Sequence, residues 1–283
     1  MGFSVVLFGC TEEKGQLEIH ANGEDFVREG FQSKDGWNVS FEKLFVTLNN
    51  IKAYQTNPPY DASNGEQPKG DYVSIAQPKT VDLALGDASA APIVVETLKA
   101  NTGQYNAIGW EMIQGDNGYT LQLIGSAQKA GQTIAFDIKI DEIYHYVCGE
   151  FVGDQRNGFV NANDTGNIEM TFHFDHLFGD AGSDANEPLN VGALGFEPLA
   201  LLAVDGKLDV TQSQLKSQLS AKDYATLLDT LATLGHVGEG HCFEAKNGYS
   251  ALKHLKTTLL WTVRPFGDKK VKSFIFIKSF IFW

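Results

Sequence analysis

The chain has 283 residues, of which 43% are hydrophobic, and this is enough to bury a sizeable core in one large domain. Asp and Glu number 35 against 22 Lys and Arg, so the formal net charge is −13 at pH 7. This surplus of negative charge repels phosphate backbones, and we expect no nucleic-acid partner. The aromatic share of 11% and the 29 glycines, against 8 prolines, favour strands joined by glycine turns over a helical bundle.

The first cysteine follows a short apolar run. Residues 5–10 (VVLFGC) resemble the lipobox of bacterial lipoproteins, in which a small residue precedes a cysteine that is lipidated and becomes the mature N-terminus. The resemblance implies a lipid anchor on Cys10, attachment to a membrane such as the outer membrane, and a periplasmic or cell-surface location. Residues 1–15 would then be the remnant of a signal peptide and the tether. The other interpretation is a first β-strand with a buried cysteine.

Residues 16–265 are expected to form one mainly β domain with the architecture of an antiparallel β-sandwich. Apolar and polar residues alternate from residue 17, and residues 57–65 predict an exposed excursion between strands because they are rich in Pro, Asn and Gly. The predicted strands lie at residues 17–21, 39–54, 105–112, 119–124, 132–140, 144–147 and 168–174.

The last of these strands leads into a pair of histidines. Because successive side chains on a strand point to opposite faces, His173 and Asp175 share the face opposite to that of the neighbouring phenylalanines. The apolar face packs against the core and the polar face is free to bind. His176 would lie on the wrong face of a continued strand, but residues 177–179 (LFG) indicate that the strand ends, which would swing His176 toward the same site.

A loop of small and acidic residues follows at residues 179–188. Its Asp180, Asp184 and Glu187, together with backbone carbonyl groups, could supply the oxygen ligands that calcium prefers. No EF-hand pattern is present, and the alternative is a plain solvated loop.

A small helical insertion is predicted over about residues 195–236. It contains a short helix at residues 197–203 and a stronger helical pattern at residues 211–234, where leucines recur near helical spacing. Ser220 followed by Asp223 resembles a capping box and predicts the start of a second helix. Residues 255–263 return to a strand pattern.

A second histidine cluster follows the helical pattern, in a glycine-rich loop at residues 235–242 (GHVGEGHC). Imidazole, carboxylate and thiolate are the ligands that zinc and copper prefer, and glycine lets the backbone bend until such ligands converge. We therefore predict one transition-metal site for copper or zinc, with both clusters supplying the candidate ligands His173, Asp175, His176, His236 and His241.

Structural roles for the same histidines are the alternative. His236 could cap the C-terminal end of the preceding helix, where the helix dipole is negative, and His173 could be an ordinary sheet histidine with a hydrogen-bond partner.

The C-terminal tail, residues 266–283, is apolar and nearly repeats itself as KSFIFI and KSFIFW. Each run is too short, and too interrupted by lysine, to span a bilayer. A closing edge strand, a segment for self-association and coding sequence read past the natural end are all compatible with this pattern.

Cys148 and Cys242 remain as a pair once Cys10 is assigned to lipid. In an oxidising compartment two cysteines can close a disulfide, which we predict, whereas two free thiols acting as soft metal ligands are the alternative.

The motifs of common enzyme classes are missing. The sequence contains no Gly-x-Ser-x-Gly elbow, no glycine-rich phosphate loop, no His-Glu-x-x-His helix and no dinucleotide fingerprint. We therefore expect no enzymatic turnover.

Three features together resemble the MbnP-like periplasmic copper-associated proteins and related uncharacterised β-sandwich lipoproteins. They are the early strand region at residues 37–54, the strand at 168–174 with the following DHLF, and the histidine loop at 235–242. The resemblance implies copper or zinc binding outside the cytoplasm, with the five candidate ligands named above at the site.

Two functions follow from these predictions. In the first, the protein is a non-catalytic extracytoplasmic lipoprotein that captures, stores or passes on copper or zinc. In the second, it is a surface or assembly protein whose sandwich and apolar tail make contacts with a protein partner or a second copy, and its histidines are structural.

Overall fold

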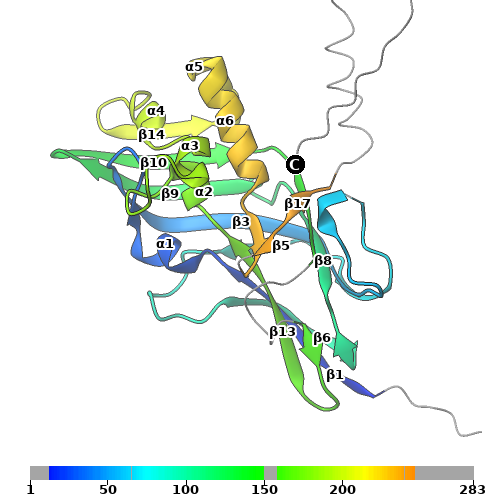
Figure 1. Cartoon of the computed structure of the whole chain (residues 1–283). Helices are drawn as coiled ribbons and strands as arrows, with labels where there is room; N and C mark the ends of the chain where they lie inside the picture. Colours follow the sequence, from blue (N-terminus) through cyan, green and yellow to red (C-terminus); the bar gives the residue numbers. More distant parts are fainter. Residues whose placement is uncertain (1–12, 65, 150–157, 239, 246–283) are drawn as a thin grey trace, which may run out of the picture. The chain divides into compact units, whose positions relative to one another are not determined.

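The computed structural model describes residues 13–64, 66–149, 158–238 and 240–245 (Figure 1). These residues form mainly β-strands in packed sheets, with few helices, which confirms the predicted fold class. Cys10, the predicted strand at residues 255–263 and the apolar tail lie outside the described residues. No helix within the described part of the chain is long and apolar enough to cross a membrane.

The larger sheet has ten strands among the described residues and is built around one long strand, β3 (Asn38–Gln55). Residues of β3 alternate between buried and more exposed positions over much of its length, as a strand with one face on a core should. The order of the main path is β14 (Lys207–Thr211), β10 (Gln132–Ile140), β9 (Leu121–Lys129), β3, β8 (Ala107–Met112), β11 (Tyr144–Gly149) and β17 (Phe243–Glu244). Three further strands pair with β3, namely β2 (Phe31–Gln32), β4 (Asp71–Ile75) and β5 (Lys79–Asp82).

The smaller sheet carries the histidines and has five strands among the described residues. Their order is β16 (Gly240–His241), β15 (Gly235–Val237), β13 (Thr165–Phe172), β1 (Lys14–Asn22) and β6 (Ile93–Asn101). Figure 1 shows β1, β6 and β13 side by side. Two short strands, β7 (Gly103–Gln104) and β12 (Phe159–Val160), form a separate ladder.

Most ladders in the described part of the chain are antiparallel, as predicted, but two are parallel. β1 pairs parallel to β13, with Asn22 opposite Thr171, and β10 pairs parallel to β14. The parallel pairing matters for the site because parallel strands end at the same edge of a sheet. The segments that follow β1 and β13 therefore begin next to each other.

Aromatic side chains join the two sheets. Trp110 of the larger sheet packs against Phe172 of the smaller one with ring centroids 6.1 Å apart, and Phe41 lies 6.0 Å from Phe174. All of these rings except that of Phe41 are at most 2% exposed. Burial of each such ring contributes about 1.5–3 kcal/mol, so the end of β13 is held firmly against the core.

The helices lie mostly where the sequence predicted them. They are α1 (Glu24–Glu29), η1 (Ala62–Asn64), α2 (Asp175–Phe178), α3 (Pro188–Gly192), α4 (Glu197–Ala200), α5 (Gln212–Gln218) and α6 (Ala221–Ala232). Ser220 begins α6 as predicted, since its hydroxyl accepts from the Asp223 backbone N–H at 3.1 Å.

Two elements were missed. The predicted helical stretch at 195–236 contains the strand β14, which follows a turn with positive φ at Asp205 and Gly206, and α1 had no clear pattern.

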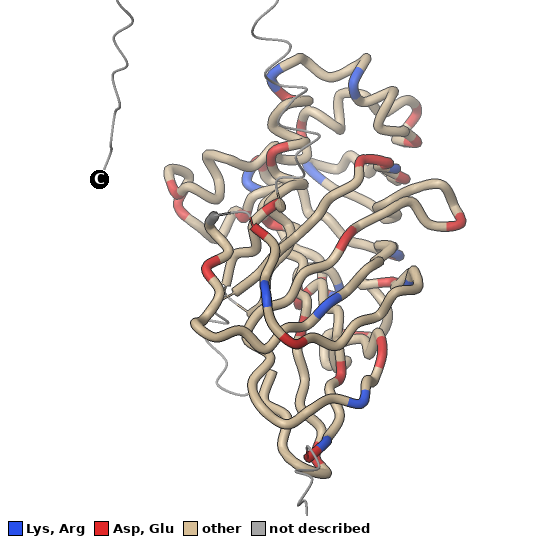
Figure 2. Tube along the Cα trace, turned by 90° about the vertical axis from the view of Figure 1, so that its right-hand side faces the viewer, with Lys and Arg blue, Asp and Glu red and all other residues tan. Residues whose placement is uncertain are grey.

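Charge is spread over the fold. Figure 2 shows Asp and Glu at many separate points along the trace, with Lys and Arg interspersed. The net charge of −13 therefore describes a broadly acidic chain rather than a single acidic patch.

A disulfide joins Cys148 in β11 to Cys242, which confirms the predicted pairing. Cys242 lies between β16 of the smaller sheet and β17 of the larger one. The chain thus changes sheets at the residue that the disulfide fixes.

Replacing both cysteines with serine should lower the free energy of unfolding by about 4 kcal/mol, because the cross-link closes a loop across 94 positions and restricts the unfolded chain. Urea unfolding in the presence of a chelator measures this. A reductant should lower the midpoint of the unmodified protein and leave that of the double variant unchanged. Equal midpoints for the two proteins without reductant would contradict the prediction.

Candidate metal centre

The first histidine segment begins where β13 ends. His173 directly follows the strand, the chain turns at Phe174, and the His176 backbone N–H donates to the His173 carbonyl at 3.2 Å. Phe174 is buried in the core, which fixes the turn. His176 therefore swings to the same side as His173, as the sequence predicted.

The second segment is a hairpin, so the prediction of a pliable loop was wrong. β15 pairs antiparallel with β13, which places His236 opposite Thr171, and β15 also pairs with β16, which places His236 opposite His241. Gly238, with φ of 55°, lies in the turn, and Glu239 lies outside the described residues. The hairpin extends the smaller sheet and holds its histidines in register.

Gly235 is required for close packing rather than for flexibility. A Cβ atom there would lie 2.8 Å from Cδ1 of Tyr146 and 3.0 Å from Cζ2 of Trp110. The residue before His236 therefore lies directly against the aromatic core, and this close approach sets the position of the His236 backbone.

The two segments bring four imidazoles together. Ring centroids of His173 and His236 are 3.9 Å apart, those of His176 and His236 are 4.9 Å apart, and those of His236 and His241 are 4.5 Å apart. The potential ligand atoms of His173, His176 and His236 all lie within 4.8 Å of one another. A tetrahedral ion with bonds of about 2.0–2.1 Å holds its nitrogen ligands roughly 3.3 Å apart, a spacing that small ring rotations can reach.

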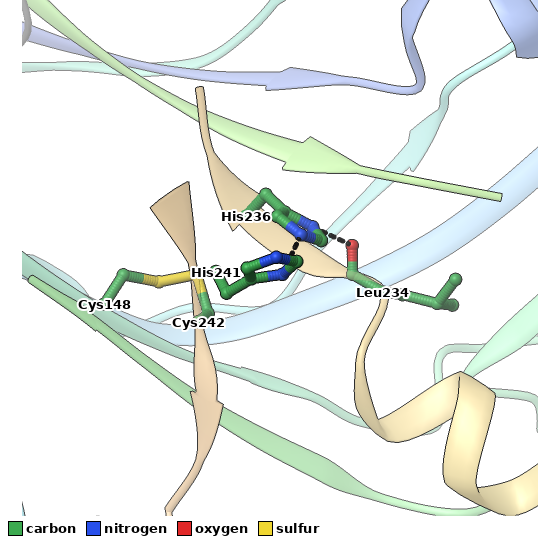
Figure 3. The surroundings of a disulfide bond; sticks show 5 residues. All are labelled: Cys148, Leu234, His236, His241 and Cys242. Carbon is green, nitrogen blue, oxygen red and sulfur yellow. Dashed lines mark hydrogen bonds between the residues drawn. A yellow bond between two sulfur atoms is a disulfide. The ribbon is translucent and has the colours of Figure 1, made fainter. Parts of the chain in front are cut away.

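The hydrogen bonds of His236 determine which of its nitrogens offers a lone pair. Nδ1 lies 3.2 Å from the carbonyl oxygen of Leu234 (Figure 3). A carbonyl can only accept, so Nδ1 carries the hydrogen and Nε2 of the neutral ring is the acceptor. Nε2 lies 2.6 Å from Nδ1 of His241, which must then donate to it.

His176 is oriented in a similar way. Its Nδ1 lies 3.2 Å from Oγ1 of Thr233, and that hydroxyl donates to the Thr230 carbonyl at 3.0 Å. Because the hydroxyl hydrogen is used, Oγ1 accepts from Nδ1 of His176, and Nε2 keeps its lone pair. Hydrogen bonds of this kind orient the histidine ligands of metal sites.

The environment of His173 includes a residue that the sequence did not reveal. Oε1 of Glu24 lies 3.3 Å from Nε2 of His173, yet the geometry is not that of a hydrogen bond, and Nε2 is buried with no hydrogen-bond partner among the described residues. Glu24 has φ of 60°, a left-handed conformation that costs a non-glycine residue roughly 1–2 kcal/mol. The parallel pairing of β1 and β13 explains the proximity, because Glu24 follows β1 as His173 follows β13.

Burial keeps the imidazoles neutral. Loss of solvent, reinforced by the neighbouring rings of His176 and His241, lowers the pKa of His173 to about 4. Burial and the nearby His173 lower the pKa of His236 to about 3. The pKa of His176 is also lowered by burial, although Asp175 opposes the shift. At neutral pH these nitrogens therefore hold lone pairs rather than protons.

A pocket of about 590 Å³ opens above the cluster, and all five predicted ligands line it. His173, His176 and His236 form the close group, whereas His241 is exposed at the rim and hydrogen-bonded to His236. Asp175 is half-buried, its Oδ1 accepts from the His176 backbone N–H at 2.9 Å, and burial raises its pKa. The sequence missed the walls of the pocket, which are supplied by α3 and α6.

The acidic loop has a different organisation from the predicted calcium site. Asp180, Asp184 and Glu187 do not form a close ligand group in the described part of the chain. The amide of buried Asn190 donates to the carbonyl oxygens of Asp180, Ser183 and Asp184, at 2.8, 3.3 and 3.1 Å. Asn190 thus occupies carbonyl groups that a calcium ion would use, and calcium binding stays a prediction.

Three neutral imidazoles from two rigid segments could hold a metal ion. Nitrogen ligands of this kind suit zinc and copper, and the donor set does not distinguish between them. Comparison of the chain with protein-family models, with curated proteins and with solved structures finds no match. The resemblance to the MbnP-like proteins therefore stays a prediction.

The metal-free domain should lose stability as the pH falls from 6.5 toward 5. Unfolded histidines take up protons near pH 6.5, whereas His173 and His236 in the folded domain do so only near 4 and 3. The unfolded state therefore binds more protons in this window, and the free energy of unfolding falls by up to about 1.4 kcal/mol per pH unit for each histidine.

Urea unfolding in a chelator at pH 7.5, 6.5 and 5.5 measures this loss. A variant with His173→Gln and His236→Gln should show a flatter response. The same pH dependence in both proteins would contradict the assignment of the effect to these two histidines.

Proposed function

We propose that this protein binds copper or zinc through His173, His176 and His236 and captures, stores or passes on the ion without turnover. The single observation that carries the proposal is the convergence of three imidazole nitrogens within 4.8 Å at the floor of a pocket. Oriented tautomers and lowered pKa values support it, because both present lone pairs to an incoming cation at neutral pH.

The proposal also places the protein outside the cytoplasm, anchored to a membrane by lipid on Cys10. The Cys148–Cys242 disulfide supports this location, since structural disulfides persist in oxidising compartments such as the periplasm. The resemblance of residues 5–10 to a lipobox is the basis for the anchor.

Protein expressed without an affinity tag, stripped with a chelator and reloaded separately with Zn²⁺ or Cu²⁺ tests the metal site. After gel filtration, elemental analysis should find about one ion per chain. Because two of three ligands are removed, His173→Ala with His236→Ala should weaken binding by more than about 100-fold, the upper end of the loss seen for outer partners of metal sites. Titration against a chromogenic chelator measures the affinity.

His20→Ala is the matched control. His20 lies on β1 of the same sheet, and its Nε2 is 3.0 Å from a carboxylate oxygen of Glu18 rather than in the cluster. The control should bind metal like the unmodified protein. No bound metal at neutral pH, or full binding by the double variant, would overturn the proposal and favour the surface or assembly protein with structural histidines.

Glu24→Gln should weaken metal binding by about 10-fold while leaving the urea midpoint of the metal-free protein nearly unchanged. The carboxylate lies 3.3 Å from His173, so its charge both orients the ring and stabilises the positive charge of the bound ion. Glu29→Gln removes the same charge from an exposed position at the other end of α1 and should have no effect. Equal affinities for the two variants would show that Glu24 plays no part in binding.

A further inference from the structure

We propose, building on the metal site above, that the bound ion keeps an exchangeable coordination position facing the pocket, where it takes a small organic amine that carries a second, metal-binding nitrogen. The inference deepens the proposed function, because it gives the site a ligand beyond the ion itself. It depends on the number of protein ligands, the size of the pocket and the charge of its walls.

The number of ligands leaves room at the ion. His173, His176 and His236 supply three donors, and copper and zinc sites with three protein ligands keep a further position for water or an exogenous molecule. His241 is the nearest rival for that position, since its Nδ1 already lies 2.6 Å from Nε2 of His236. It is exposed, however, and does not belong to the close group of ligand atoms.

The pocket is far larger than an ion requires. Its volume of about 590 Å³ compares with about 30 Å³ for one water molecule in the liquid. Pockets that bind small organic molecules usually measure about 300–1,000 Å³. An ion with a single bound water would leave most of this space to solvent, whereas an organic ligand of several heavy atoms would fill it.

The walls of the pocket determine which ligand fits. Pro188 and Leu189 of α3 form an apolar side that suits a carbon skeleton. Asp229 of α6 and Asp175 of α2 supply carboxylates, and neither Lys nor Arg is found among the described residues that line the pocket. A positively charged amine is therefore attracted to the walls, and an anionic group is repelled.

Cobalt(II) and azide test the exchangeable position. The full chain loaded with Co²⁺ shows visible absorption bands that depend on the ligands of the ion. Azide should change these bands in a saturable way in the unmodified protein. Bound Co²⁺ with bands that azide leaves unchanged would overturn the inference while leaving the proposed function intact. The inference is overturned in the same way if azide acts only on His241→Ala, because His241 then fills the position. Failure to bind Co²⁺, Zn²⁺ or Cu²⁺ at all would overturn the proposed function together with the inference.

Two imidazole compounds of equal chain length test the ligand class. Histamine carries an ammonium group, and 3-(imidazol-4-yl)propionate carries a carboxylate in the same place. Histamine should bind the Co²⁺-loaded protein about fivefold or more tightly than the propionate, and Asp229→Asn should reduce this ratio. Asp205→Asn is the control, since Asp205 is exposed, lies outside the pocket and has a positive φ that asparagine tolerates. Equal affinities for the two compounds, or an equal loss of preference in both variants, would overturn the assignment of an amine ligand.

Discussion

The backbone carbonyl of Leu234 accepts two hydrogen bonds, and together they join the histidine segments. The His173 backbone N–H donates to it at 3.0 Å and Nδ1 of His236 at 3.2 Å. Leu234 is completely buried, so water does not compete for this oxygen. A single acceptor therefore sets the distance between the end of β13 and the β15–β16 hairpin and also selects the tautomer of His236. The convergence of the imidazoles depends on this geometry more than on any direct contact between the rings.

Burial of the cluster has a cost that metal binding can offset. Imidazoles that stack at 3.9 Å with little exposure to water lose hydration without gaining strong hydrogen bonds, and Nε2 of His173 has no hydrogen-bond partner among the described residues. An ordinary structural histidine would have its polar atoms satisfied. The positive φ of Glu24 adds backbone strain beside the same ring. Unsatisfied polar atoms and strain gathered at one place are typical of a functional site, where a ligand compensates for them.

The sequence predicted the parts of the molecule that depend on local pattern. Alternation along β13 placed His173 correctly, the end of that strand placed His176, and Ser220 with Asp223 marked the start of α6. Other features depend on contacts between distant segments. Glu24 reaches His173 only because β1 and β13 pair in parallel, which neither strand encodes by itself. The hairpin at residues 235–241 was taken for a loop because its glycine content suggested flexibility, whereas Gly235 serves close packing against Trp110.

The disulfide completes the constraints on the site. His241 pairs with His236 across a short hairpin, and a two-stranded hairpin alone is only marginally stable. Cys242, the next residue, is bonded to Cys148 of β11, and the following β17 pairs with β11. The outer arm of the hairpin is thereby fixed to the larger sheet, while its inner arm pairs with β13 of the smaller one. Both sheets therefore position the histidines, and any change in how the sheets pack would reach the site through Cys242.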